Sequence, residues 1–188
     1  MTNHSHNGHR VTGFRRLMRF LKRLRSHDGV AAIEFAMIGG FASISMLNAA
    51  DVAIYARDRL EVENATEIGA QAAWKTCDSK HVPATVNCPG LNSAVTTAVQ
   101  STSLGTAVTL QSGSPSEGYY CVDSSGVLTR VSDVSSKPVD CTSAGTPSNS
   151  PGDYIKVQTT FTYAPLFPAS VASAFAATIT KTAWMRLD

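Results

Sequence analysis

The 188-residue chain has few of the side chains from which catalytic sites are built. Aromatic residues make up 7% of it, and of the five histidines only His81 follows residue 30. After residue 30, a Ser-His-Asp triad or a Cys-His pair is therefore excluded unless His81 is its histidine. The prolines near His81 favour an exposed loop over a catalytic site. The sequence also lacks a glycine-rich phosphate loop and a cluster of metal ligands. We therefore expect no enzyme activity, no cofactor and no metal ion.

Acidic residues are scattered and basic residues are concentrated at one end. Residues 1–29 hold seven basic and one acidic residue, a net charge of +6, whereas residues 30–188 hold nine and thirteen, a net charge of −4. Nucleic-acid binding would need basic residues clustered on the folded part, so no nucleic-acid partner is expected. A paired-carboxylate hydrolase has no local support in this spacing but stays an alternative.

Residues 30–50 hold a single ionisable side chain, Glu34, among mostly Ala, Ile, Phe, Met and Gly. At ~1.5 Å per helical residue, this stretch of 21 residues is about long enough to cross a membrane. The basic residues before it predict a cytoplasmic N-terminus and a translocated remainder. A secretory signal peptide is the alternative, but the sequence around Ala49 and Ala50 has no clean small-x-small cleavage site.

The start of this apolar stretch carries a motif. Glu34 is the fifth residue after Gly29, Phe35 follows it, and a basic leader precedes both. This arrangement resembles the prepilin-peptidase site of type IV pilin-like proteins, although Val30 stands where type IV pilins have Phe. With the downstream segment YARDRLEVENATEIGAQAA, residues 55–73, the chain resembles the TadE-like pseudopilins of tight-adherence (Flp-type) pilus systems. The resemblance is closest over residues 28–73.

The resemblance implies a processed pilus-assembly protein of the bacterial inner membrane, with its C-terminal domain periplasmic or extracellular. Residues 1–29 would be a leader, starting at Met1 or Met18, that a prepilin peptidase removes. The partners would be the membrane, the peptidase, other pilin-like subunits and the pilus assembly platform. An uncleaved, single-pass anchored domain that binds a ligand outside the membrane is the rival interpretation.

Glu34 has two interpretations. A carboxylate in an apolar span costs a few kcal/mol, so it has a partner or reaches water at the interface. The resemblance implies a partner, namely the ammonium group that cleavage would create on Val30 of a neighbouring subunit. Such an ion pair in a low dielectric would set the register between subunits.

The four cysteines, Cys77, Cys88, Cys121 and Cys141, all follow the apolar stretch. An even number on the translocated side predicts two disulfides in an oxidising compartment. Of the three possible pairings, Cys77–Cys88 with Cys121–Cys141 closes the shortest loops and is the one we expect. A zinc site is the alternative, but no Cys-x2-Cys spacing supports it.

The hydrophobic pattern predicts an α+β fold with a pilin-like layout. We expect one transmembrane and stalk helix over residues 30–76, with Leu60 among its apolar positions, and a disulfide-stapled domain with a small antiparallel sheet over residues 77–188. Pro83 and Pro89 predict a loop without helix at 77–90. An amphipathic helix should run from Leu91 to near Gly105. The remaining expectations are strands at 108–110, 119–122, 127–131, 153–163 and 178–187, a polar loop at 132–152 and a short helical turn at 171–177.

Overall fold

The structure is a computed structural model that describes residues 27–77, 79–166, 175 and 177–188. The chain divides into two compact units, Met1–Ala50 and Asp51–Asp188, and each is described here by itself. The helical turn expected at 171–177 falls largely outside the described residues. The division at residue 50 places the second half of the first described helix in the same unit as the sheet.

The first described helix, α2, covers His27–Thr76 without interruption, close to the helix predicted at 30–76. In the first unit none of its residues 29–50 is buried. Its apolar window has a mean hydropathy of 1.8, and none of that window is buried. By length and composition, this helix is long and apolar enough to cross a membrane, and its exposure distinguishes it from the core helix of a soluble protein.

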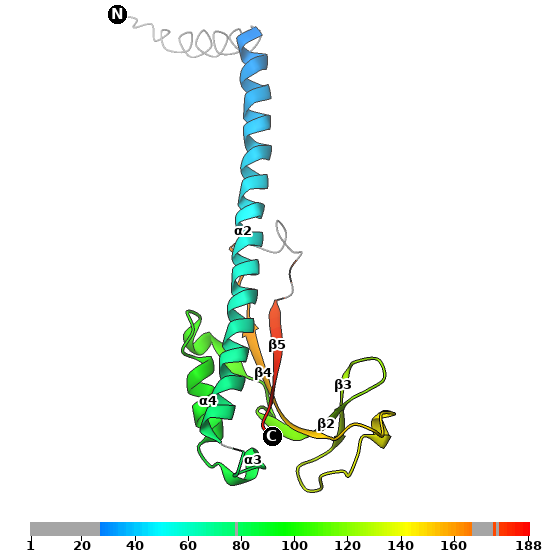
Figure 1. Cartoon of the computed structure of the whole chain (residues 1–188). Coiled ribbons are helices and arrows are strands. Elements are labelled where there is room, and N and C mark those ends of the chain that lie inside the picture. The colour runs from blue at the N-terminus through cyan, green and yellow to red at the C-terminus, as the bar shows by residue number, and fades with distance from the viewer. Residues whose placement is uncertain (1–26, 78, 167–174, 176) are drawn as a thin grey trace, which may run out of the picture. The chain divides into compact units, whose positions relative to one another are not determined.

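The second unit contains a five-stranded antiparallel sheet (Figure 1). Its strands are β1 Val108–Leu110, β2 Ser116–Val122, β3 Leu128–Ser132, β4 Gly152–Thr162 and β5 Thr178–Arg186. The long strand β4 is central, with β5 paired along one side and β1 and β2 sharing the other. β3 pairs with the outer side of β2. All five predicted strands exist, and together with the helices they confirm the α+β class.

Short helical segments follow α2 in the chain, and here two predictions were wrong. Helix α4, Leu91–Val99, ends well before Gly105, where a separate 3-10 turn, Gly105–Ala107, begins. A four-residue helix, α3 Ala84–Asn87, lies inside the supposed helix-free loop. Pro83 is its N-cap, a position near the helix start where proline is tolerated because its missing N–H would have no partner in the helix. A further 3-10 turn covers Thr142–Ala144.

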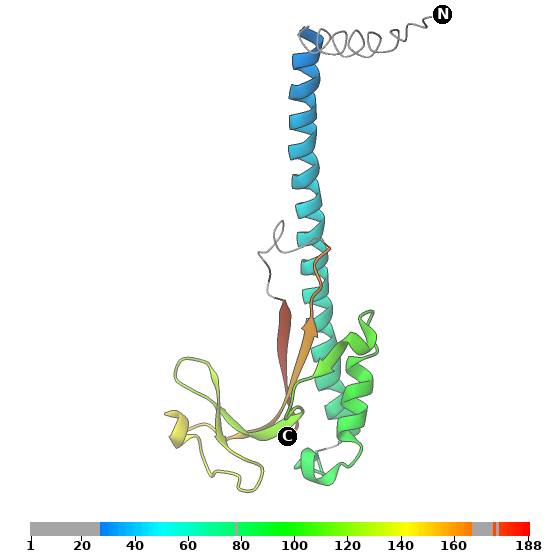
Figure 2. The ribbon, with the colours of Figure 1, turned by 180° about the vertical axis from the view of Figure 1, so that it is seen from behind.

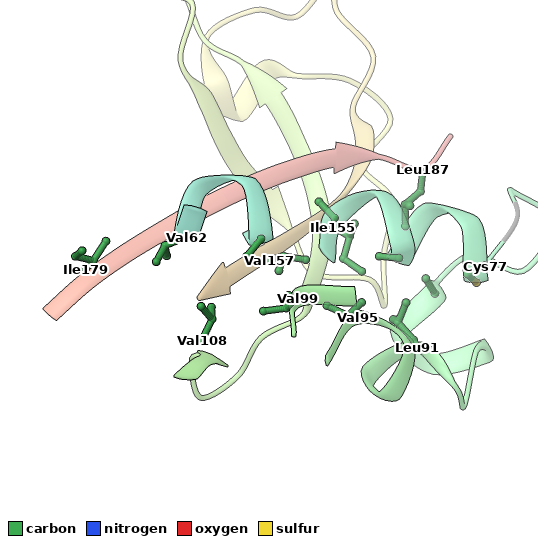
Figure 3. Packing of buried hydrophobic residues seen from close by; sticks show 14 of the residues in the cluster. Val62, Cys77, Leu91, Val95, Val99, Val108, Ile155, Val157, Ile179 and Leu187 are labelled. Atoms are coloured by element: carbon green, nitrogen blue, oxygen red, sulfur yellow. The ribbon is translucent and has the colours of Figure 1, made fainter. Parts of the chain in front are cut away.

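The hydrophobic core lies between one face of the sheet and the pair α2 and α4, which lie side by side in both views (Figures 1 and 2). Figure 3 shows Val62 of α2, Val95 and Val99 of α4, and Ile155 and Val157 of β4 directed into it. Apart from Asp51, the buried residues of α2 recur at helical spacing and are mostly small: Val62, Ala65, Thr66, Gly69, Ala70 and Ala73. Leu60, expected on the apolar face, is instead 68% exposed.

Gly69 sets how closely α2 approaches α4. A Cβ at this position would lie 2.6 Å from Val99 Cγ2 and 3.4 Å from Val157 Cγ1, far inside van der Waals contact for the first. Close approach of this kind needs a residue without a side chain. One turn earlier, the Thr66 hydroxyl lies 2.6 Å from that of Thr159, so the polar pair buried at this contact is satisfied.

Both disulfides are the pairs with the shortest loops. Cys77–Cys88 joins the end of α2 to the residue after α3, and Cys121–Cys141 joins β2 to the polar loop before β4. All four cysteines are used, which excludes the zinc alternative for them. The Cys77–Cys88 bridge fixes the segment that carries α3. The Cys121–Cys141 bridge fixes a polar loop that has few apolar side chains to bury.

Candidate functional site

The predicted processing residues Gly29, Val30, Glu34 and Phe35 all lie on α2, within the first unit. Val30 is 55% exposed and Phe35 is 79% exposed, and Glu34 is exposed as well. Val30 and Glu34 are four residues apart, so they lie on the same face of the helix, one turn from each other. The apolar side chains that follow, from Met37 to Leu47, are also exposed, so a large apolar surface surrounds the carboxylate.

Polar side chains further along this apolar segment bond to their own helix. The Ser43 hydroxyl donates to the Gly39 carbonyl at 2.7 Å, and Ser45 and Asn48 donate in the same way to the carbonyls four residues back. Such bonds satisfy the hydroxyl donors of the two serines and one N–H of Asn48, which lowers the cost of placing them in lipid. Glu34 differs, because no hydrogen bond or ion pair of its carboxylate exists within the described residues.

Unlike the polar side chains that bond to their own helix, Glu34 needs a partner from outside this segment. An ionised carboxylate on an apolar surface without a donor is costly, so a partner from outside this segment would stabilise it. If the chain were cut after Gly29, the helix would begin at Val30, with an ammonium group at the positive end of the helix dipole. A carboxylate is the group that neutralises both the ammonium and the dipole, and Glu34 is the only one within residues 30–50.

The second unit begins with a buried polar site that sequence reasoning missed. Asp51 is fully buried, and its Oδ1 accepts hydrogen bonds from Tyr163 Oη at 2.9 Å and from the Leu166 backbone N–H at 3.0 Å. Burial, reinforced by the bond to Asp51, raises the pKa of Tyr163 to about 12. These bonds tie α2 to the chain just after β4. The only sequence signal is an aspartate at the end of the apolar run.

Three carboxyl groups converge at the other end of the sheet: Glu117 of β2, Asp153 of β4 and the C-terminal residue Asp188. Both oxygens of the Glu117 carboxylate are hydrogen-bonded: they accept bonds from the Ala84 and Thr85 N–H groups, both at 2.7 Å, and from the Thr85 hydroxyl at 2.6 Å. These are the free N–H groups at the start of α3. Glu117 therefore explains why that short helix forms.

Asp153 is the least satisfied member of the three. It is 1% exposed, and neither of its carboxylate oxygens has a hydrogen-bond partner among the described atoms. Burial, together with the nearby charges of Glu117 and Asp188, raises the pKa of Asp153 to about 7. Asp188 is held by Lys137 and Arg186, each at 3.0 Å.

The position of these acids bears on the hydrolase alternative. Glu117 is committed to α3, Asp188 is committed to two cations, and Asp153 is enclosed, so none of them presents a free carboxylate to a substrate. We interpret the trio as a structural connection between β2, β4, α3 and the C-terminus. His81 lies in the disulfide-closed segment, outside this trio. In the described part of the chain no group of three or more His, Cys, Asp or Glu side chains is arranged to hold a metal ion.

Comparison with known proteins adds no relative. No protein-family model matches the chain, and neither a curated protein nor a solved structure matches it.

Proposed function

We propose that the chain is a TadE-like pseudopilin that a prepilin peptidase cuts after Gly29 and that acts in the assembly of a tight-adherence pilus. The observation that carries the proposal is the state of Glu34. It is the single ionisable side chain of residues 30–50, it is exposed, and it has no partner in the described part of the chain. The other polar side chains named above bond to their own helix instead.

The mechanism follows from charge and helix geometry. Cleavage leaves an ammonium group on Val30 at the N-terminus of a helix, where the dipole already disfavours positive charge. The carboxylate of Glu34 from a neighbouring subunit offsets both the ammonium charge and the positive end of the helix dipole. Each subunit then presents one ammonium and one carboxylate, so pairing continues from subunit to subunit and fixes their register.

The exposed apolar surface of α2 supports assembly with other helices in a membrane. Gly39 and Gly40 have no heavy atom within 4 Å of the position a Cβ would occupy, so their side of the helix is open. Small residues let helices approach closely in lipid. The partners are therefore other pilin-like subunits and the assembly platform in the bacterial inner membrane, with residues 51–188 on the periplasmic or extracellular side.

The test is Glu34→Gln in the full chain, expressed with the peptidase and the pilin-like partners. Glutamine keeps the size of the side chain and removes its charge, so insertion and cleavage should proceed. Removing one side of a buried ion pair costs ~3–5 kcal/mol, because the remaining ammonium is left unpaired in low dielectric. That is a loss of association of about a hundredfold or more.

Glu61→Gln is the matched control, since it removes an equal charge from α2 outside the apolar segment. We expect this variant to co-purify with its partners normally and Glu34→Gln to fail. Normal co-purification and piliation of Glu34→Gln would reduce Glu34 to a side chain that reaches interfacial water, and the proposed pairing would be wrong.

A further inference from the structure

The free edge of β5 lies beside a groove against α2. The groove has a volume of about 490 Å³ and is lined on one side by Glu63, Glu67 and Gln71 of α2. Its other side is formed by residues 181–185 of β5. Both walls belong to the second unit, Asp51–Asp188. The groove is therefore independent of the proposed cleavage after Gly29.

The pairing register shows which backbone groups of β5 are free. Leu187 N–H donates to the Asp153 carbonyl, and Tyr163 N–H donates to the Ala177 carbonyl, so odd-numbered residues of β5 bond to β4. In an antiparallel ladder the alternate residues direct their N–H and C=O groups the other way. Thr180, Thr182 and Trp184 therefore point their backbone groups outward, and no other described strand pairs with β5.

This edge lacks the usual protection against pairing with another chain. Edge strands are normally short, bulged, interrupted by proline or guarded by a charged side chain. β5 has nine residues, its register with β4 is unbroken over nine pairs, and it contains no proline. It has two charged side chains, and both are engaged: Lys181 is bound to Glu63 of α2 and Arg186 to Asp188, so neither guards the edge. The edge is open to an added strand.

The charge of the groove indicates what kind of strand fits. Lys181 neutralises Glu63, which leaves the carboxylate of Glu67, one helical turn further on, without a partner in the described part of the chain. Glu67 is exposed at the centre of the α2 wall. Two exposed apolar residues, Leu60 and Trp74, lie seven residues to either side of it on the same face of α2. The α2 wall of the groove is thus polar, with its acidic side chain at Glu67, and the two apolar residues lie beyond its ends on the same helix face.

We propose that this groove binds an extended segment of another polypeptide, which adds a strand to β5 and brings a basic side chain to Glu67. Side chains of the added strand that alternate toward α2 meet Glu67 in the groove and, beyond its ends, the exposed Leu60 and Trp74, so the segment carries apolar residues on both sides of its Lys or Arg. A second copy of this chain does not satisfy the groove. Its β5 offers Lys181, which its own Glu63 already binds.

The test uses the full chain in detergent micelles and the peptide acetyl-TVTKTVT-amide, with acetyl-TVTETVT-amide as its charge-reversed control. Amide hydrogen exchange by NMR is the readout. The basic peptide should slow exchange of the Thr180, Thr182 and Trp184 amides at least about tenfold, because pairing encloses those N–H groups. The Lys181 and Ala183 amides, already bonded to β4, should not change.

Variants then test the charge and the backbone. Glu67→Lys should lower affinity for the basic peptide about two- to tenfold and reverse the preference between the two peptides. Glu61→Lys, with the same charge change outside the groove, should not. Thr182→Pro removes an outward N–H and should abolish binding while β4–β5 pairing stays, since edge strands tolerate proline.

Three results would overturn the proposal. The first is no protection of the three outward amides at millimolar peptide. The second is equal binding of both peptides to the wild-type chain. The third is protection of the same amides without peptide that grows with protein concentration, because a second copy would then occupy the edge.

Discussion

The bond between Tyr163 and Asp51 should be a large single contribution to the stability of the second unit. Tyr163 Oη and the Leu166 N–H are the two donors to Asp51 Oδ1, and Asp51 Oδ2 has no partner among the described atoms. Tyr163→Phe removes one of two donors from a fully buried carboxyl group. Leaving a buried acceptor without its donor costs ~1–3 kcal/mol, so we expect the free energy of unfolding to fall by about that amount.

Urea unfolding of the full chain in micelles, followed by tryptophan fluorescence, measures this loss. Both tryptophans, Trp74 and Trp184, lie in the second unit, so the signal reports that unit. Tyr55→Phe is the control. The Tyr55 ring packs edge-on against that of Tyr163, with the ring centroids 5.1 Å apart, but its hydroxyl has no hydrogen bond within the described residues. The control should change stability by less than ~0.5 kcal/mol.

Tyr163, which makes this bond, also predicts that the stability of the second unit falls at alkaline pH. Tyr163 keeps its proton in the folded chain up to a pKa of about 12, mainly because of burial, whereas an unfolded tyrosine ionises near pH 10. The folded state therefore holds the proton more tightly, and its advantage is complete below pH 10 and lost as the pH rises toward 12. Tyr163→Phe should lose less stability over this interval than the wild type. The reasoning is refuted if Tyr163→Phe costs no more than Tyr55→Phe.

Other predictions concern the core, the acidic trio and the disulfides. Gly69→Ala should destabilise the second unit by ~1–3 kcal/mol in the same urea assay, because its methyl group meets Val99 Cγ2. The double variant with Val99→Ala should lose less stability than the sum of the two single variants, and simple additivity would disprove the clash. Asp153 keeps its proton in the fold up to a pKa of about 7, so its contribution to stability is complete below pH 4 and lost as the pH rises to 7. Asp153→Asn should remove that fall in stability between pH 4 and pH 7, and an unchanged profile would assign the fall to other groups. Replacing Cys121 and Cys141 together by Ala should lower the free energy of unfolding by ~2–4 kcal/mol, and a loss near zero would show that the bridge does not stabilise the loop.

The elements that were predictable from sequence are those with a strong local pattern. The uninterrupted apolar and helical spacing after Gly29 identifies α2, and the alternation of Ile155, Val157 and Thr159 with polar residues identifies β4. Of the three pairings that four cysteines allow, cysteine spacing favours the observed one, because short loops close at lower entropy cost.

The missed features depend on tertiary contacts. α3 forms because Glu117, more than thirty residues away, binds its first N–H groups, and no local signal in 84–87 contains that information. Leu60 fits an apolar helical pattern, yet the sheet covers only the face of α2 that carries Val62 and Ala65. The buried carboxyl groups of Asp51 and Asp153 were equally unpredictable, since burial of a charge opposes the local preference.

The most direct test of the central proposal is the N-terminal residue of the chain extracted from membranes that contain a prepilin peptidase. N-terminal sequencing and intact mass should identify a chain of 159 residues beginning at Val30. Gly29→Leu should stay uncut, because a bulky side chain then occupies the residue before the cleaved bond. A wild-type chain that begins at Met1 or Met18 would mean an uncleaved anchored domain, and one that begins at Asp51 would mean a removed signal peptide; each would contradict the proposal.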